Sequence, residues 1–166
     1  MNIPDELREN VPKLEVYFAN KPQIVLAYLF GSQARGEAHP DSDLDLGILL
    51  AESIPEREYT EQRLEIIGDL MQLLRSNEVD ILILNEAPLV MRYQVISRGK
   101  LLFYRDRQAA IDFRVRALNA YFDFKPILDH HRKVFFQKTR EGKLLHGHNR
   151  YRGALTSDTK LSSDPT

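Results

Sequence analysis

The chain contains no cysteine among its 166 residues. This absence excludes disulfide bonds and thiolate metal sites, and it is compatible with a reducing compartment. There is also no apolar run approaching the roughly 18 residues that a membrane-spanning helix needs. The first ten residues, MNIPDELREN, are charged and lack the apolar segment of a signal peptide. We therefore expect a cytoplasmic protein that does not contact a membrane.

An excess of charge of either sign is missing as well. The chain has 23 lysines and arginines against 24 aspartates and glutamates, which gives a net charge of -1. This balance argues against a surface built throughout for nucleic acid. The local exception runs from Arg132 to Arg152, where seven residues are basic and Glu141 is the one acidic residue. This basic run is either a solvated tail or a docking segment, and we favour a protein partner for it over RNA.

Hydrophobic residues make up 43% of the chain, which is enough for the core of one small domain. Apolar runs bounded by proline, glycine or polar residues predict strands over residues 24–30, 44–50, 79–84 and 100–104. Helical spacing predicts helices over residues 4–19, from a capping box at 53–56 to about 75, over 88–99, and from 107 to about 142 with a break near Pro126. In the second of these helices, Leu64, Ile67, Met71 and Leu74 form the expected buried face.

This order of elements predicts an α/β (α+β) fold, in which helices pack on a small mixed β-sheet and a C-terminal helical segment follows. We expect a first domain over residues 1–105, a helical segment over 106–142, and a basic and polar tail over 143–166.

The most informative stretch is GSQARGEAHPDSDLDL, residues 31–46. Asp43 and Asp45 are two residues apart at the start of a predicted strand, so their side chains project to the same face. Two charges at about 4 Å repel by roughly 4 kcal/mol at an effective dielectric constant of about 20. Asp41 adds a third acid nearby. A bound cation would offset this repulsion, and carboxylate oxygens suit Mg²⁺ or Mn²⁺.

The residues before and after this pair complete the pattern. Gly31 allows a ligand to approach the backbone closely, and Ser32 offers a hydroxyl group and a free N–H group to a phosphate. Asp80 begins an apolar strand, where we expect it to be buried and to act as a third carboxylate. Arg35 either contacts phosphate or braces the loop by pairing with an acid such as Asp41. Together these residues predict a site for a nucleoside triphosphate and divalent metal ions.

The combination of Gly31-Ser32, a ten-residue spacer, and Asp43-x-Asp45 resembles the signature of the nucleotidyltransferase fold that is shared with DNA polymerase β. The fuller string resembles the minimal nucleotidyltransferases that act as antitoxins of helical HEPN ribonuclease toxins. The resemblance covers about residues 23–105, and a weaker likeness extends to AYFDFKPIL at residues 120–128.

The resemblance implies that Asp43, Asp45 and Asp80 are catalytic and hold Mg²⁺, with two ions expected and Mn²⁺ as an alternative. It also implies that Gly31 and Ser32 hold the triphosphate of ATP. The expected reaction is transfer of AMP to a tyrosine of the toxin, in a hetero-oligomer of the two proteins. Two alternatives remain open: an aminoglycoside-type adenylyltransferase, and an antitoxin that acts by binding alone.

Overall fold

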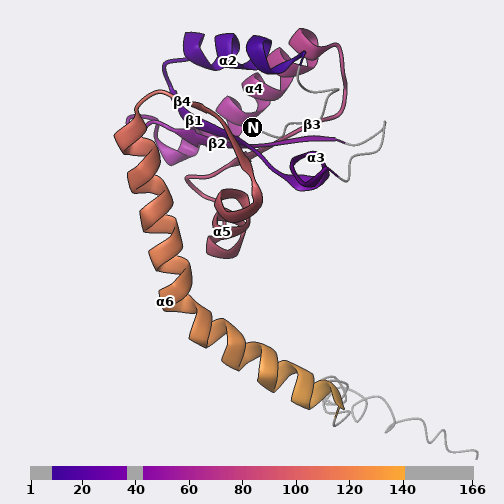
Figure 1. Cartoon of the computed structure of the whole chain (residues 1–166), viewed down its shortest axis with the longest axis vertical. Helices are drawn as coiled ribbons and strands as arrows, with labels where there is room; N and C mark the ends of the chain where they lie inside the picture. Colours follow the sequence, from indigo (N-terminus) through magenta and orange to yellow (C-terminus); the bar gives the residue numbers. More distant parts are fainter. Residues whose placement is uncertain (1–8, 37–42, 141–166) are drawn as a thin grey trace, which may run out of the picture. The chain divides into compact units, whose positions relative to one another are not determined.

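The computed structural model describes residues 9–36 and 43–140, and Figure 1 shows the arrangement of their helices and strands. The elements in chain order are α2 (Val11–Asn20), β1 (Ile24–Leu29), α3 (Gly31–Arg35), β2 (Leu44–Leu50), the short 3₁₀ helix η1 (Glu56–Glu58), α4 (Tyr59–Leu74), β3 (Val79–Ile83), α5 (Leu89–Arg98), β4 (Lys100–Tyr104) and α6 (Arg107–Arg140). The chain forms two compact units that divide between Asp123 and Phe124, and each is described by itself. Within the described ranges, no helix is both long enough and apolar enough to cross a bilayer.

The four strands form one mixed sheet in the order β3-β2-β1-β4. Strand β1 pairs antiparallel with β2 on one side and with β4 on the other. Strand β2 pairs parallel with β3, which leaves β3 and β4 as the edge strands. The predicted fold class, a small mixed sheet with packed helices, is confirmed.

Both faces of the sheet are covered, and the alternation of side chains along β2 shows how. Leu44, Leu46 and Ile48 belong to a core cluster that also contains residues of α2 and α4. The intervening position Gly47 points to the opposite face, where the nearest side chains are those of Val95 on α5 and Leu84. Asp45 shares the side of Gly47 by the same alternation. The carboxylate therefore belongs to the face that α5 and the start of α6 cover (Figure 1).

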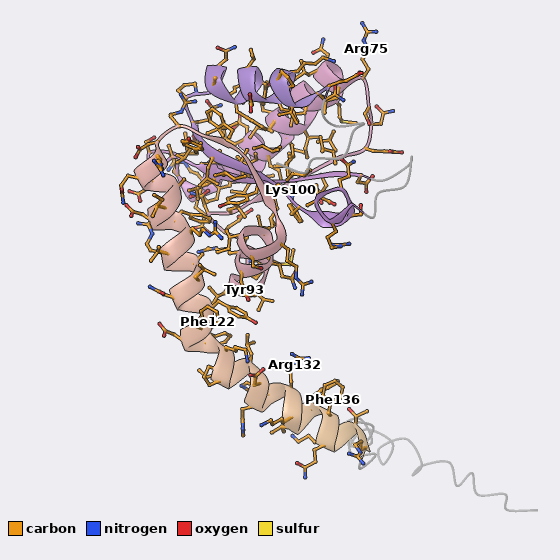
Figure 2. All side chains as sticks on the ribbon, viewed as in Figure 1. Arg75, Tyr93, Lys100, Phe122, Arg132 and Phe136 are labelled. Atoms are coloured by element: carbon orange, nitrogen blue, oxygen red, sulfur yellow. The ribbon has the colours of Figure 1, made fainter. Side chains whose placement is uncertain are left out.

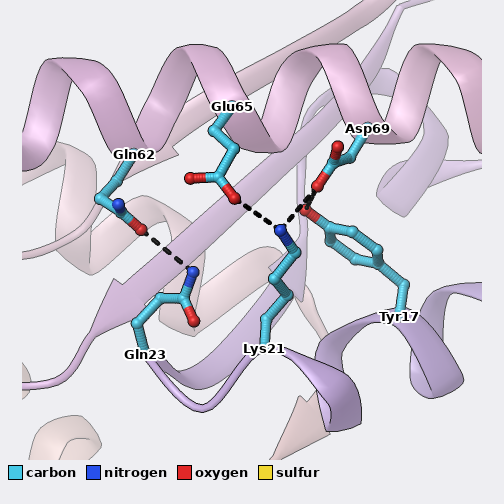
Figure 3. A network of polar contacts seen from close by, with 6 residues as sticks. All are labelled: Tyr17, Lys21, Gln23, Gln62, Glu65 and Asp69. Atoms are coloured by element: carbon cyan, nitrogen blue, oxygen red, sulfur yellow. Dashed lines mark hydrogen bonds and ion pairs between the residues drawn. The ribbon is translucent and has the colours of Figure 1, made fainter.

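A network of polar side chains fastens α2 to α4 (Figure 3). The Lys21 ammonium lies 2.6 Å from a Glu65 oxygen and 2.8 Å from an Asp69 oxygen. The Tyr17 hydroxyl donates to the same Asp69 carboxylate at 2.9 Å. The hydrogen bond from Lys21 lowers the pKa of Asp69 below its ordinary value, against an opposing effect of burial. The network therefore stabilises the cover of one face of the sheet.

The expected capping box at residues 53–56 is wrong. Helix α4 begins at Tyr59, after η1, and no side chain caps its first turn. Pro55 has an extended backbone, with φ -73° and ψ 150°, and a proline disfavours helical conformation in the residue before it. Ile54 packs against the core at this point, which fixes the turn in place of a helix.

The predicted buried face of this helix is only partly correct. Ile66 and Leu70 are its fully buried residues, with Ile67 and Leu74 packed beside them. Leu64, which was expected in the core, is 59% exposed. The other predicted helices agree better, although residues 4–8 of the first one lie outside the described part of the chain.

The expected break near Pro126 is also wrong, because α6 continues through it from Arg107 to Arg140. A proline inside a helix removes one N–H donor and crowds the carbonyl four residues earlier, here that of Phe122. Both residues are exposed, so water can hydrate the freed carbonyl. The predicted helix end near Gly142 and the tail over 143–166 lie outside the described residues.

Candidate functional site

The two halves of the sequence motif meet at Gly31. This residue follows the end of β1, begins α3, and has a positive φ of 70°, which favours glycine. The backbone N–H of Phe30 donates to the carbonyl of Asp45 at 2.9 Å. A Cβ atom on Gly31 would collide with the Asp45 carboxylate. Gly31 is therefore required at this position both by its backbone conformation and by its contact with Asp45.

The short helix α3 is tied to the other aspartate of the pair. The Gln33 side chain donates from Nε2 to the backbone carbonyl of Asp43 at 3.2 Å. Ser32 is half-buried within α3, and Arg35 is exposed in its last turn. Gly36 ends the helix in the left-handed conformation, with a φ of 74°. Asp41, the third acid of the sequence motif, lies outside the described residues.

Asp80 is brought to this site by the parallel pairing of β2 with β3. The register places Asp45 opposite Asp80 and Leu44 opposite Val79. The N–H of Leu44 also donates to the carbonyl of Glu78 at 2.8 Å, which fixes this register at its start. The third carboxylate predicted from the sequence therefore lies on the neighbouring strand, beside Asp45.

The expectation that Asp80 is buried is wrong. Its side chain is exposed, because β3 is an edge strand and Asp80 is close to its beginning. Asp43 is exposed as well, and it immediately precedes β2, while Asp45 is half-buried. Asp45 is therefore partly shielded from solvent, whereas Asp43 and Asp80 are open to it.

The electrostatics of Asp45 reflect its neighbours. Burial raises the pKa of the Asp45 carboxyl group, and the negative charges of Asp80 and Asp43 raise it further. The Arg35 guanidinium acts in the opposite direction and lowers this pKa. Arg35 therefore acts electrostatically on the acidic cluster, which the sequence had left open between phosphate binding and pairing with an acid.

The donor set fits a divalent cation in its chemistry. Carboxylate oxygens are the ligands that Mg²⁺ and Mn²⁺ prefer, and the repulsion that raises the pKa of Asp45 is the kind that a cation relieves. Among residues 9–36 and 43–140, no three acidic or histidine side chains are already gathered around one point.

Sequence reasoning did not identify the roles of Gln33 and of the Phe30 backbone. Both contacts join residues that are ten or more positions apart, across a loop whose path local patterns do not reveal. The one sequence feature that could have indicated a role for Gln33 is its position inside the motif, directly after Gly31 and Ser32. Its side chain sets the position of the Asp43 backbone relative to α3.

Comparison with known proteins identifies the family that this chain matches. The family described as Polymerase beta, Nucleotidyltransferase matches residues 12–108. The chain is similar to "Protein adenylyltransferase MntA" of Shewanella oneidensis, with 32% identity over 115 residues that cover 69% of this chain and 71% of the relative.

Two solved structures with similar folds are toxin–antitoxin complexes. One is a crystal structure of a toxin–antitoxin with AMP-PNP, with a TM-score of 0.60 and 29% identity over 81% of this chain and 99% of the matched chain. The other is a tri-AMPylated Shewanella oneidensis HEPN toxin in complex with an MNT antitoxin, with a TM-score of 0.58 and 25% identity over 80% of this chain and 98% of the matched chain.

Proposed function

Because this chain belongs to the polymerase beta nucleotidyltransferase family, we propose that it is an antitoxin that transfers AMP from ATP to a tyrosine of a cognate HEPN ribonuclease toxin. Its relative in Shewanella oneidensis is named a protein adenylyltransferase. The similar complexes contain an ATP analogue in one case and a tri-AMPylated HEPN toxin in the other. The observation that carries the proposal for this chain is the contact of Gly31 with Asp45, with Asp80 paired in register beside it.

We assign the nucleotide to the residues around Gly31. The missing side chain of Gly31 lets the Asp45 carboxylate lie directly against the backbone at the start of α3, and the Ser32 hydroxyl group beside it can donate to a phosphate oxygen. Arg35 is exposed and can place its guanidinium against the same phosphates. Asp43, Asp45 and Asp80 would hold Mg²⁺, with two ions expected and Mn²⁺ as the alternative. Such ions, when bound, neutralise the charge that develops on the phosphate oxygens.

Asp80 has a second role in this proposal, as the general base. Its carboxylate is exposed at the sheet edge, so an incoming tyrosine hydroxyl group can approach it without displacing part of the core. A carboxylate within hydrogen-bond reach of that hydroxyl accepts the proton as the oxygen attacks the α-phosphate, and the bond from the α-phosphorus to the bridging oxygen breaks to release pyrophosphate. Asp45 is half-buried and bears the repulsion of its neighbours, so it is less suited to meet a protein substrate.

The toxin is proposed to dock on the C-terminal half of α6, outside the region that carries the chemistry. Phe124, Phe135 and Phe136 are 39%, 56% and 58% exposed there, and basic residues lie between and beyond them. Exposed aromatic residues with interspersed charge are typical of protein-binding surfaces. We therefore propose residues 1–105 for nucleotidyl transfer, 106–142 for partner docking in a hetero-oligomer, and 143–166 as a basic and polar tail.

The proposed function is tested with α-labelled ATP, Mg²⁺ and the cognate HEPN protein. The native chain should transfer label to that protein, and Asp80→Asn should still bind ATP while losing most of the transfer rate. Asp80→Asn transfer at the native rate would show that the third carboxylate has no catalytic role. Full neutralisation of the toxin by a chain that transfers no label would favour an antitoxin that acts by binding alone.

A further inference from the structure

A cavity of about 500 Å³ lies in the first compact unit, at the opposite end of β2 from the aspartates. Its lining includes Leu49 and Leu50, which are the last two residues of β2. Asp45 is near the other end, about 16 Å away along the strand at roughly 3.3 Å per residue. The cavity is therefore separate from the proposed nucleotide site.

The size and lining of this cavity suit a small ligand. Binding pockets typically enclose about 300–1,000 Å³, with mostly apolar walls and a few polar groups. The apolar part of the wall comes from β1, β2, the residue that follows β3, α5 and the first half of α6. It consists of Val25, Leu49, Leu50, Leu84, Leu89, Ala109, Phe113, Ala117 and Ala120.

Arg92 contributes a guanidinium group to the wall. Its Nη2 atom donates to the backbone carbonyl of Asn85 at 2.6 Å. Its Nε atom is buried and has no hydrogen-bond partner within the described part of the chain. Buried donors without partners are rare in native proteins because they lose their hydration without compensation. Because Nε has almost no accessible surface, a ligand in the cavity would meet the guanidinium group through its other atoms.

The walls of the cavity are held in place by contacts of their own. The Asn85 side-chain amide accepts from the Leu50 N–H at 2.8 Å and donates to the Leu50 carbonyl at 3.0 Å. Tyr93 on α5, which Figure 2 labels, stacks on Tyr121 of α6. Their ring centroids are 3.7 Å apart, and the angle between the ring planes is 8°. These contacts fix β2, α5 and the first part of α6 to one another, so the cavity exists without a ligand.

We propose that this cavity binds a carboxylate attached to an apolar body. Arg92 and Arg116 contribute two guanidinium groups to the lining, and Glu52 contributes one carboxylate, which leaves one net positive charge for a ligand anion. A single carboxylate matches this charge better than a phosphate does, and the apolar wall accommodates the rest of the ligand. The molecule that carries this carboxylate is either a small free acid or a protein chain whose C-terminal residue is apolar. The inference is independent of the proposed transfer reaction.

The test uses the full-length protein and isothermal calorimetry with octanoate. Octanoate should bind saturably, and 1-octanol, which has the same apolar body without the charge, should bind at least tenfold more weakly. Arg116→Gln should weaken octanoate binding by about tenfold or more, as the loss of a charge-assisted hydrogen bond does. Ala120→Trp should block the cavity from its rim, because Ala120 is an exposed lining residue.

Asn119→Trp is the matched control, since it adds the same side chain at the next position of α6, where the residue is exposed and does not line the cavity. It should leave octanoate affinity unchanged. A short peptide ending in leucine, compared with its C-terminal amide, distinguishes the two sources: tighter binding of the free peptide acid than of octanoate identifies a protein terminus.

Three results would overturn the proposal. Octanoate that does not bind, or that binds no better than 1-octanol, would exclude the carboxylate. Octanoate binding that Ala120→Trp leaves unchanged would place the ligand elsewhere on the protein.

Discussion

Gly31 lies directly against the Asp45 carboxylate, and Gly31→Ala should therefore have two separable effects. A Cβ atom there must collide with the Asp45 carboxylate, and the positive φ adds backbone strain of about 1–2 kcal/mol for any other residue. We expect a loss of stability greater than this strain and a loss of AMP transfer. Thermal unfolding and a label-transfer assay measure the two effects.

Gly36→Ala is the control for this substitution. Gly36 has a φ of 74°, but a Cβ atom on it would meet nothing within 4 Å among residues 9–36 and 43–140. Gly36→Ala should lose about 1–2 kcal/mol of unfolding free energy through backbone strain alone, and it should retain AMP transfer. Equal effects of the two substitutions would argue that the contact between Gly31 and Asp45 has no importance.

Asp45→Asn tests the electrostatics of the cluster. Burial and the charges of Asp80 and Asp43 raise the folded-state pKa of Asp45, so its ionised form destabilises the fold at neutral pH. Without metal, the asparagine variant should melt at a higher temperature than the native chain at pH 7. This advantage should shrink as the pH falls through the raised pKa and vanish at about pH 4, near the unfolded-state value.

The measurement is a series of thermal melts in EDTA between neutral and acidic pH. A stability difference that stays constant across this range would contradict the assigned repulsion. The same variant should lose nearly all transfer, because stability and activity place opposite demands on this carboxylate.

The positions of the site residues could be predicted from the sequence, whereas their contacts could not. The paired aspartates and the Gly-Ser step are local, and Asp80 stands out as an acid in an apolar run. The collision at Gly31 and the register of Asp45 with Asp80 depend on which strands pair and how they align, and local patterns do not contain that information. The exposure of Asp80 could not be predicted for the same reason, because nothing in its own segment shows that β3 is an edge strand.

At the scale of elements, Arg105 holds the end of α2 against the sheet. Its guanidinium donates to the carbonyls of Phe18, Lys21 and Ile24 at 3.0, 2.8 and 3.0 Å. The carbonyl of Phe18 belongs to the last turn of α2, and it also accepts from the backbone N–H of Lys21 at 3.2 Å. Arg105→Ala should cost about 1.5–3 kcal/mol of unfolding free energy, the usual range for hydrogen bonds to a charged group.

Chemical denaturation measures this cost. Arg98→Ala is the matched control, because Arg98 is exposed and makes no hydrogen bond or ion pair within the described part of the chain; it should change stability by less than about 0.5 kcal/mol. If the two variants were equally stable, the hydrogen bonds of Arg105 would contribute nothing to the fold.

The strands were predicted well and the helix boundaries less well, for a physical reason. Residues 44–50 match β2 because a short apolar run between polar segments is sufficient to define a buried strand. The start of α4 and the course of α6 through Pro126 depend on tertiary packing and solvent exposure, which outweigh capping and breaker signals.

At the scale of the whole molecule, the chemistry and the docking of the toxin should be separable. Replacing Arg132, Lys133, Lys138 and Arg140 with glutamate should weaken toxin binding and make the remaining affinity less sensitive to salt. These residues are exposed on the C-terminal part of α6, whereas Gly31, Asp45 and Asp80 belong to the first unit. ATP affinity, measured by calorimetry, should stay near the native value.

A charge-matched control replaces four exposed basic residues of the first unit, Lys13, Arg57, Arg63 and Arg98, with glutamate. It changes the net charge equally and should leave toxin affinity nearly unchanged. Loss of ATP affinity in the α6 variant, with toxin binding preserved, would reverse the assigned roles of the two regions.

We propose that this chain adenylylates its HEPN partner through Asp43, Asp45 and Asp80. Intact-mass spectrometry of the partner, after incubation with the chain, ATP and Mg²⁺, tests it most directly. The partner's mass should rise by one or more whole adenylyl groups, with the modification on a tyrosine, and neither Asp43→Asn nor Asp45→Asn should produce the rise. An unchanged partner mass with the native chain, or an equal rise with both variants, would show that these aspartates do not transfer AMP to the partner.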